Sequence, residues 1–139
     1  MDVTQLPFNR LIGLEACPSE TGLLVALPGG PEFGNHLGTV HASALLAVAE
    51  AASGAFLVRH LRTASNLVPV VRRVEAKFRR PALGRVAARA TTSAGEAASW
   101  VTELAARGRV LAPVAVEVVD AGEVVVLTAT VEWFISIGT

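Results

Sequence analysis

The chain is poor in cysteine and in aromatic residues. Cys17 is its single cysteine, tyrosine is absent, and aromatic residues make up 5% of the 139 positions. One cysteine cannot form a disulfide within the chain, which suits a reducing cytoplasm. The 12 basic and 12 acidic residues cancel, so the basic surplus typical of nucleic-acid-binding proteins is missing, and few aromatic rings remain for stacking on bases. We therefore expect a cytoplasmic protein without a nucleic-acid partner.

Signals for export, membrane insertion and metal binding are also missing. The first residues contain no basic segment followed by an apolar run, so no signal peptide is expected. Residues 42–58 form an apolar run, but Glu50 near its middle would be costly inside a bilayer. His36 and His41 stand five positions apart, and no paired histidines or cysteines show metal-ligand spacing. We expect neither a membrane segment nor a metal site.

Hydrophobic residues make up 52% of the chain and charged residues 17%. This balance, at this length, favours one folded domain over residues 1–139 with a sizeable core.

The most informative stretch runs from Asn35 to Gly54. A polar loop leads into a segment in which Glu50 is the only ionisable side chain between residues 42 and 58. A helix that is apolar on every side is a buried helix, and a lone carboxylate inside it should have a raised pKa. Glu50 is therefore a candidate acid, base or nucleophile. We expect Thr39 to cap this helix and the helix to end near Leu61.

The remaining segments favour strands. Two short ones are expected before the helix, at residues 11–16 and 22–27. After it and an exit loop at 63–66, residues 68–80 alternate with a period of two, so that Val70 and Val74 would face the core and Val71 the solvent. Further strands are expected at 85–92, 109–120 and 123–137, and the short Asp-Ala-Gly turn between the last two predicts a hairpin.

A second helix is expected between the later strands. Ser93 and Glu96 form a capping-box pattern, and Gly108 would end the helix after Arg107. The predicted fold class is α+β, with an antiparallel sheet wrapped around a long central helix and an extra short helix between later strands.

The loop and the central helix carry a recognisable pattern. Asn35, Gly38 and His41 stand in an Asn-x-x-Gly-x-x-His arrangement, and Glu50 follows nine positions after the histidine. With the strand-end sequence 78–82, these residues resemble the hotdog-fold thioesterase superfamily, and within it the small acyl-CoA thioesterases of the phenylacetate-pathway type. The resemblance covers roughly residues 8–137.

The resemblance implies a role for each matching residue. Glu50 matches the catalytic carboxylate, as general base or nucleophile, and Ala42 the position whose backbone N–H polarises the thioester carbonyl. Asn35 matches a loop residue that touches substrate or positions water, and His41 a residue that shapes the same loop. Gly38 of that loop is a candidate substrate-binding residue. The substrate would be an acyl-CoA or acyl-carrier thioester, with coenzyme A as part of the substrate and no separate cofactor.

A basic cluster follows the central helix. Its members are Arg72, Arg73, Lys77, Arg79 and Arg80. Arginine and lysine bind phosphate well, so Arg79 and Arg80 are candidates for contact with coenzyme A. The alternative is a solvated strand face.

Spacing along the helix argues for two subunits. Ala42 and Glu50 are eight residues apart, or about 12 Å at the helical rise, whereas a thioester carbon must approach both groups closely. Two antiparallel helices across a homodimer would bring Ala42 of one chain to Glu50 of the other. We therefore expect at least a homodimer, and no residue decides between a dimer and a tetramer.

Two departures from the family pattern keep other functions open. Ala42-Ser43 replaces a frequent Gly-Gly pair, and Val71 stands where many relatives have serine or threonine. They motivate a non-catalytic acyl- or CoA-binding protein as an alternative. A separate hypothesis is that the protein is a hydratase or dehydratase, because His36 and Glu50 have the fourteen-residue spacing found in hotdog acyl-carrier dehydratases.

Overall fold

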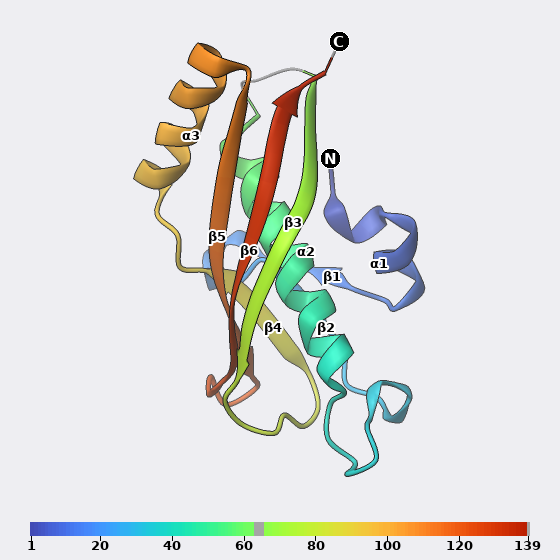
Figure 1. Ribbon diagram of the computed structural model, residues 1–139. Coiled ribbons are helices and arrows are strands. Elements are labelled where there is room, and N and C mark those ends of the chain that lie inside the picture. Colours follow the sequence, from blue (N-terminus) through green and yellow to red (C-terminus); the bar gives the residue numbers. More distant parts are fainter. Residues whose placement is uncertain (63–65, 139) are drawn as a thin grey trace.

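The computed structural model describes residues 1–62 and 66–138 (Figure 1). The two helices and the six strands expected from the sequence occur in the predicted order, and the structure adds the short helix α1 and three 3-10 helices (η). In chain order they are η1 (Val3–Gln5), α1 (Pro7–Leu11), β1 (Glu15–Ala16), η2 (Ser19–Thr21), β2 (Val25–Leu27), η3 (Pro31–Phe33), α2 (Ala42–His60), β3 (Leu67–Phe78), β4 (Val86–Ala90), α3 (Ala94–Arg107), β5 (Arg109–Asp120) and β6 (Val125–Ile137). Most of the predicted exit loop, residues 63–65, lies outside the described residues.

The described strands form one six-stranded antiparallel sheet in the order β1-β2-β4-β5-β6-β3. The sheet curls around α2, which crosses its inner face (Figure 1). The predicted hairpin is confirmed, because β5 and β6 pair antiparallel. Its turn is held by Asp120 Oδ1, which accepts hydrogen bonds from the N–H groups of Gly122 and Val124. The expected α+β class with a sheet wrapped around one long helix is confirmed.

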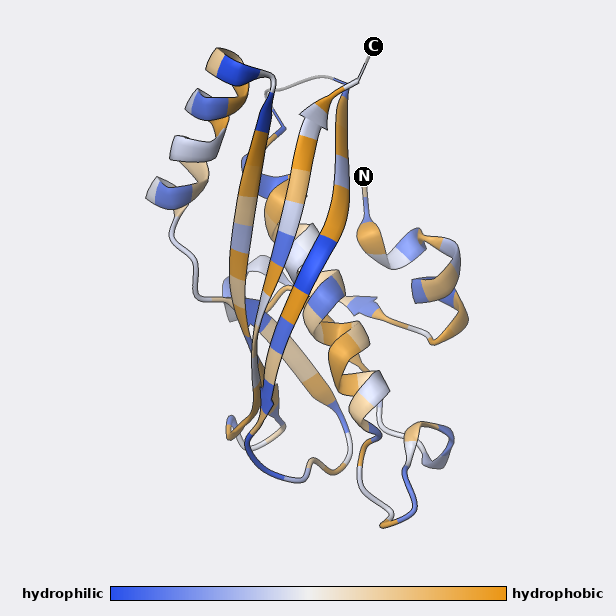
Figure 2. Cartoon of the chain, viewed as in Figure 1, coloured by the Kyte–Doolittle hydropathy of each residue, from blue (hydrophilic) through white to orange (hydrophobic). Residues whose placement is uncertain are grey.

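Helix α2 is the core helix. Val48 and Ala52 are fully buried, and the many alanines let its backbone pack closely on the strands. Figure 2 shows apolar residues on several sides of this helix. By length and composition α2 could cross a membrane, but its packing under the sheet is that of a partly buried core helix.

Helix α3 lies beside α2 on the sheet and confirms the predicted capping box. The Glu96 N–H donates to Ser93 Oγ at 3.1 Å, and Gly108 ends the helix with a φ of 73°. Trp100 on its buried face meets Phe56 of α2 edge-on, with ring centroids 6.3 Å apart. This contact joins the two helices across the core.

Strand β3 differs from the sequence-based prediction. A bulge between Val71 and Arg73 shifts the alternation, so Val71 lies opposite the buried Trp133 and faces the helix side, whereas Val70 lies opposite Phe134 on the outer face. In the single chain, the prediction that β3 has one solvated and one buried face is also wrong. Both faces of β3 are largely exposed, and α2 packs mainly on β2, β4, β5 and β6 rather than on this edge strand.

Candidate functional site

The loop before α2 is held by one asparagine. Asn35 Oδ1 accepts hydrogen bonds from the N–H groups of Leu37 and Thr39, and Asn35 Nδ2 donates to Thr39 Oγ1 at 2.8 Å. Gly38 has a φ of 78°, a conformation that side-chain-bearing residues rarely adopt. Asn35 therefore fixes the loop, and its predicted contact with substrate stays a prediction.

The helix cap is His41, and the prediction of Thr39 is wrong. His41 Nδ1 accepts a hydrogen bond from the Ser43 N–H at 3.0 Å, while the His41 N–H donates to the Phe33 carbonyl. Thr39 is unavailable as a cap because its hydroxyl is bonded to Asn35 two residues before the helix boundary. The predicted loop-shaping role of His41 agrees with this geometry.

The first turn of α2 leaves one donor free at its start. Among the described residues, no hydrogen bond uses the Ala42 N–H, although the following N–H of Ser43 is capped. Ala42 is exposed, and the positive end of the helix dipole lies beside it. This N–H can therefore receive a developing oxyanion.

Glu50 lies two turns further along α2. Its side chain is half-buried, and no ion pair or hydrogen bond with another described residue accounts for it. Burial raises the pKa of the Glu50 carboxyl above its ordinary value of 4.5. The Glu50 carboxylate therefore has the properties of a general base: it is desolvated, it has no partner among the described residues, and it is partly accessible to solvent.

Ala42 and Glu50 belong to one unbroken helix, so this chain does not bring them together. Eight residues of α-helix separate them by about 12 Å. No cluster of three or more potential metal ligands occurs within residues 1–62 and 66–138. His36 is exposed on the loop that precedes α2.

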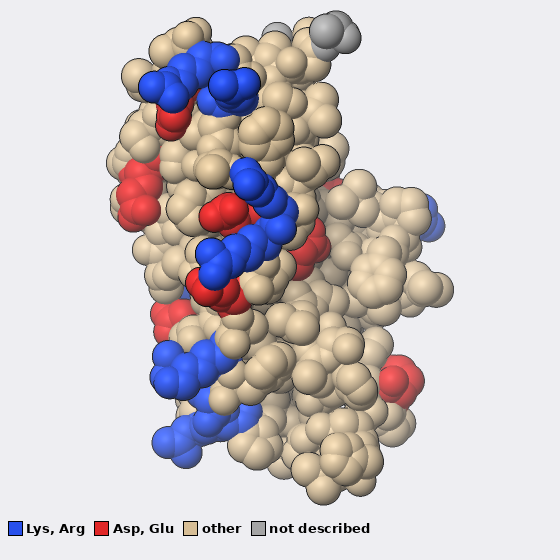
Figure 3. Space-filling model, in the orientation of Figure 1, with Lys and Arg blue, Asp and Glu red and all other residues tan. Residues whose placement is uncertain are grey.

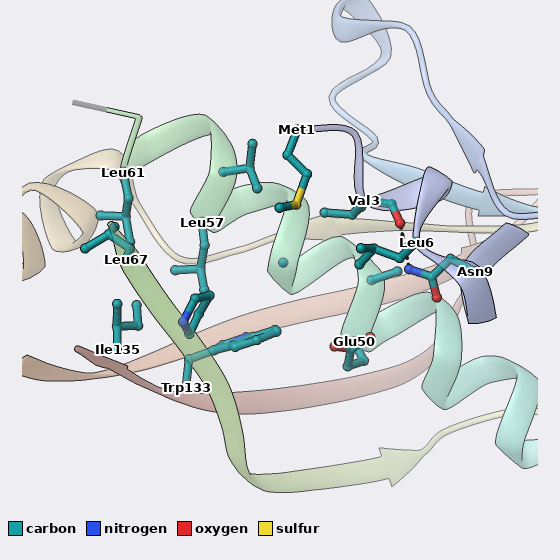
Figure 4. Close-up of a pocket in the computed structure, with 14 residues that line it drawn as sticks. Met1, Val3, Leu6, Asn9, Glu50, Leu57, Leu61, Leu67, Trp133 and Ile135 are labelled. Carbon is teal, nitrogen blue, oxygen red and sulfur yellow. Dashed lines mark hydrogen bonds between the residues drawn. The ribbon is translucent and has the colours of Figure 1, made fainter. Parts of the chain in front are cut away.

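An apolar cavity of about 420 Å³ opens beside Glu50 (Figure 4). Its walls come from three places: the N-terminal segment with Met1, Val3 and Leu6, the side of α2 that follows Glu50, and the inner face of β3 and β6. Figure 4 shows Glu50 at one end and Leu61 with Leu67 at the other. Volumes in this range are typical of small-molecule sites.

Trp133 forms part of the cavity wall and is held in place by Ser53. The indole N–H donates to Ser53 Oγ at 2.9 Å, and that hydroxyl donates to the Glu50 carbonyl at 2.6 Å. The sequence analysis did not identify Trp133, Ser53 or the N-terminal segment as part of the site. Trp133 and the N-terminal segment are far from Glu50 in sequence, and only Ser53 is near it. A serine buried in an apolar helix was the one available signal, since buried hydroxyls need partners.

The predicted phosphate-binding arginines lie where β3 ends. Arg79 Nε donates to Thr128 Oγ1 at 3.2 Å, and the N–H groups of Arg79 and Arg80 bond to the Val126 carbonyl. The following segment is tied to the Asn35 loop, because the Val40 N–H donates to the Ala82 carbonyl. Figure 3 shows basic side chains gathered at this end of the sheet. Their contact with coenzyme A stays a prediction.

Among protein-family models, DUF4442, a domain of unknown function, matches residues 19–135. No sequence among the curated proteins matches the chain.

Comparison with solved structures places the fold. A Pseudomonas aeruginosa protein of unknown function, described as a probable thioesterase, is 26% identical, with a TM-score of 0.81 over 98% of this chain and 91% of the other. A Bacillus halodurans protein crystallised with CoA is 17% identical, with a TM-score of 0.64 over 92% and 74%. A phenylacetic acid degradation-related candidate thioesterase from Ralstonia eutropha is 22% identical, with a TM-score of 0.64 over 93% and 90%. These likenesses confirm the predicted hotdog fold and its thioesterase-like relatives.

Proposed function

This chain belongs to the DUF4442 family and has the hotdog fold, and from that premise we propose that it hydrolyses acyl-CoA thioesters. One observation carries the proposal. Glu50, an unpaired and desolvated carboxylate, lies at the end of an apolar cavity large enough for an acyl group. Solved relatives described as thioesterases, and one bound to CoA, support the same reaction class.

The chemistry needs a base or nucleophile and an oxyanion donor. In one route Glu50 removes a proton from water as the water oxygen attacks the thioester carbon, and in the other the carboxylate attacks that carbon itself. The carbonyl oxygen becomes an oxyanion, which the Ala42 N–H stabilises. The carbon–sulfur bond then breaks and the thiolate of coenzyme A takes up a proton; in the second route, water hydrolyses the anhydride formed with Glu50.

The two groups meet in a homodimer. The inner face of β3 bears Val71, Val74 and Phe78, which are apolar and yet 39%, 45% and 49% exposed. As an edge strand, β3 also presents unpaired backbone N–H and C=O groups. Pairing of β3 with its copy would satisfy those groups and bring a second α2 over the exposed residues. Glu50 of one subunit would then face Ala42 of the other.

The remaining features suit a coenzyme A thioester in the cytoplasm. Arg79 and Arg80 would meet its phosphates at the end of β3, beside the loop that Asn35, Gly38 and His41 shape. Cys17 is a free, partly buried thiol, in keeping with a reducing compartment.

Thiol release tests the proposal directly. Acetyl-, octanoyl-, dodecanoyl-, palmitoyl- and phenylacetyl-CoA are offered to the wild type and to Glu50→Gln. Loss of the carboxylate should lower kcat by about 10²–10⁴-fold, the usual contribution of a general base. Glu132→Gln, a half-buried carboxylate on β6 away from the cavity, is the matched control and should keep wild-type turnover.

Equal turnover by the wild type and Glu50→Gln would contradict the proposed mechanism. Saturable binding of acyl-CoA without any thiol release would instead support an acyl-CoA-binding protein.

A further inference from the structure

The cavity beside Glu50 has one polar end and an otherwise apolar wall. Apart from Glu50, the polar side chain on its wall is Asn9, whose Nδ2 is already bonded to the Val3 carbonyl at 2.8 Å, and the Trp133 N–H is bonded to Ser53 (Figure 4). Such a wall suits an apolar group whose single polar end reaches the carboxylate.

The cavity is elongated along α2. Glu50, Gly54, Val58 and Leu61 recur at intervals of three or four residues and so lie on one stripe of the helix. From Glu50 to Leu61 the helix rises about 16 Å. A chain of several methylene groups would lie along this stripe with its carbonyl at Glu50.

Gly54 stands in the middle of that stripe, without a side chain. A Cβ built there would lie 3.7 Å from Trp133 Cζ2 and 3.7 Å from Val3 Cγ1, which is ordinary van der Waals contact. Alanine would therefore fit without displacing any neighbour, and it is the better helix former. Packing gives no reason for the glycine, whereas a methyl group would narrow the cavity between Trp133 and the N-terminal segment.

We infer that this cavity binds the acyl chain of the thioester and that Gly54, facing Val3 of the N-terminal segment, sets how long a chain it accepts. The inference rests on the proposed function, and it adds a specificity-determining residue that the chemistry at Glu50 does not require. Chains that end before Gly54 are indifferent to it. Chains that run past it need the gap between Trp133 and Val3 to stay open.

The test compares Gly54→Ala and Gly54→Val with Ala55→Val, a matched change at the next helix position, off the cavity wall. kcat/KM is measured for acetyl-, octanoyl- and dodecanoyl-CoA. We expect Gly54→Val to lower octanoyl and dodecanoyl turnover by about 10-fold or more, within the range that one or two methyl-sized groups produce in an apolar pocket. Acetyl-CoA turnover should stay near that of the wild type, and Gly54→Ala should lie between, with a raised Tm.

Equal loss for all three acyl groups, no loss at all, or a lowered Tm in Gly54→Ala would overturn the inference. A binding measurement separates its failure from failure of the proposed function. The chain has two tryptophans, so in a Trp100→Phe background Trp133 fluorescence reports on the cavity alone.

The Trp133 fluorescence of this variant is then titrated with dodecanoyl-CoA and with CoA alone. The titrations test whether the cavity binds the acyl chain, even if no thioester is cleaved. A saturable change with dodecanoyl-CoA only, weakened by Gly54→Val, supports the inference. The same response to CoA alone, or a response that Gly54→Val leaves unchanged, refutes it.

Discussion

At the scale of single residues, Glu50 is defined by what surrounds it. It has no cationic partner, and burial is the only cause that raises its pKa. The ionised form is the one that activates water, so turnover should rise with pH along a limb whose midpoint lies above 4.5. A pH–rate profile for kcat/KM, which reports the pKa of the free protein, checks this expectation. A midpoint at or below 4.5 would show that the working base is not a desolvated carboxylate.

The same burial predicts a pH-dependent change in stability. Between 4.5 and the raised pKa, the folded chain holds a proton on Glu50 that the unfolded chain has released, so the free energy of unfolding falls as pH rises. Glu50→Gln carries no such charge. The free energy of unfolding of Glu50→Gln minus that of the wild type should therefore increase as the pH rises from below 4.5 to neutral. Chemical denaturation at each pH measures this difference. A constant difference across that range would contradict the desolvation of Glu50.

The positions of some candidate residues could be predicted from the sequence and those of others could not. Asn35 and His41 stand in a polar stretch and Glu50 in the apolar run after it, so local composition predicts which of them lie before the helix and which lies in it. The cap was assigned to Thr39 because a hydroxyl is a common cap, but that hydroxyl bonds to Asn35 and leaves the role to His41 Nδ1. Trp133 reaches Ser53 from a strand 80 residues away, and nothing local predicts such a contact.

At the scale of elements, a proline at the start of α2 can test whether the Ala42 N–H binds the oxyanion. Ala42 is the first residue of the helix, where proline is well tolerated, and His41 before it is extended with a ψ of 141°. Ala42→Pro therefore removes the one N–H proposed to bind the oxyanion and leaves the helix in place. We expect kcat to fall by about 10²–10³-fold, as for other lost oxyanion donors.

Ala42→Ser keeps the N–H and is the control for that change. It should retain most of the activity, while circular dichroism confirms equal helix content in both variants. Wild-type turnover by Ala42→Pro would remove this N–H from the mechanism.

The elements themselves were largely predictable because each has a local cause. The capping box, the glycine at the end of α3 and the Asp120 turn all act within a few residues. The phase of β3 was not predictable, because its bulge depends on pairing with β6. The short β1 and β2 were expected to be longer; β1 is held by pairing with β2, and β2 pairs with β1 and β4 and packs against α2.

At the scale of the whole molecule, the exposed inner face of β3 predicts self-association. Val74→Asp places a charge on that face and should give monomers in sedimentation experiments, with loss of turnover. Leu111→Asp is the matched control, because Leu111 is 44% exposed against 45% for Val74 but lies on β5 in the interior of the sheet. It should stay dimeric. A wild type that sediments as a monomer would contradict the proposed interface.

The most direct test of a site shared between two subunits is to mix two inactive variants. Glu50→Gln and Ala42→Pro chains, exchanged or co-expressed, form mixed dimers in which one site receives both intact groups and the other receives neither. Each mixed dimer then has one working site, so random pairing should restore about one quarter of wild-type thiol release. If Glu50 and Ala42 instead acted within one subunit, every site would remain defective and mixing would restore nothing.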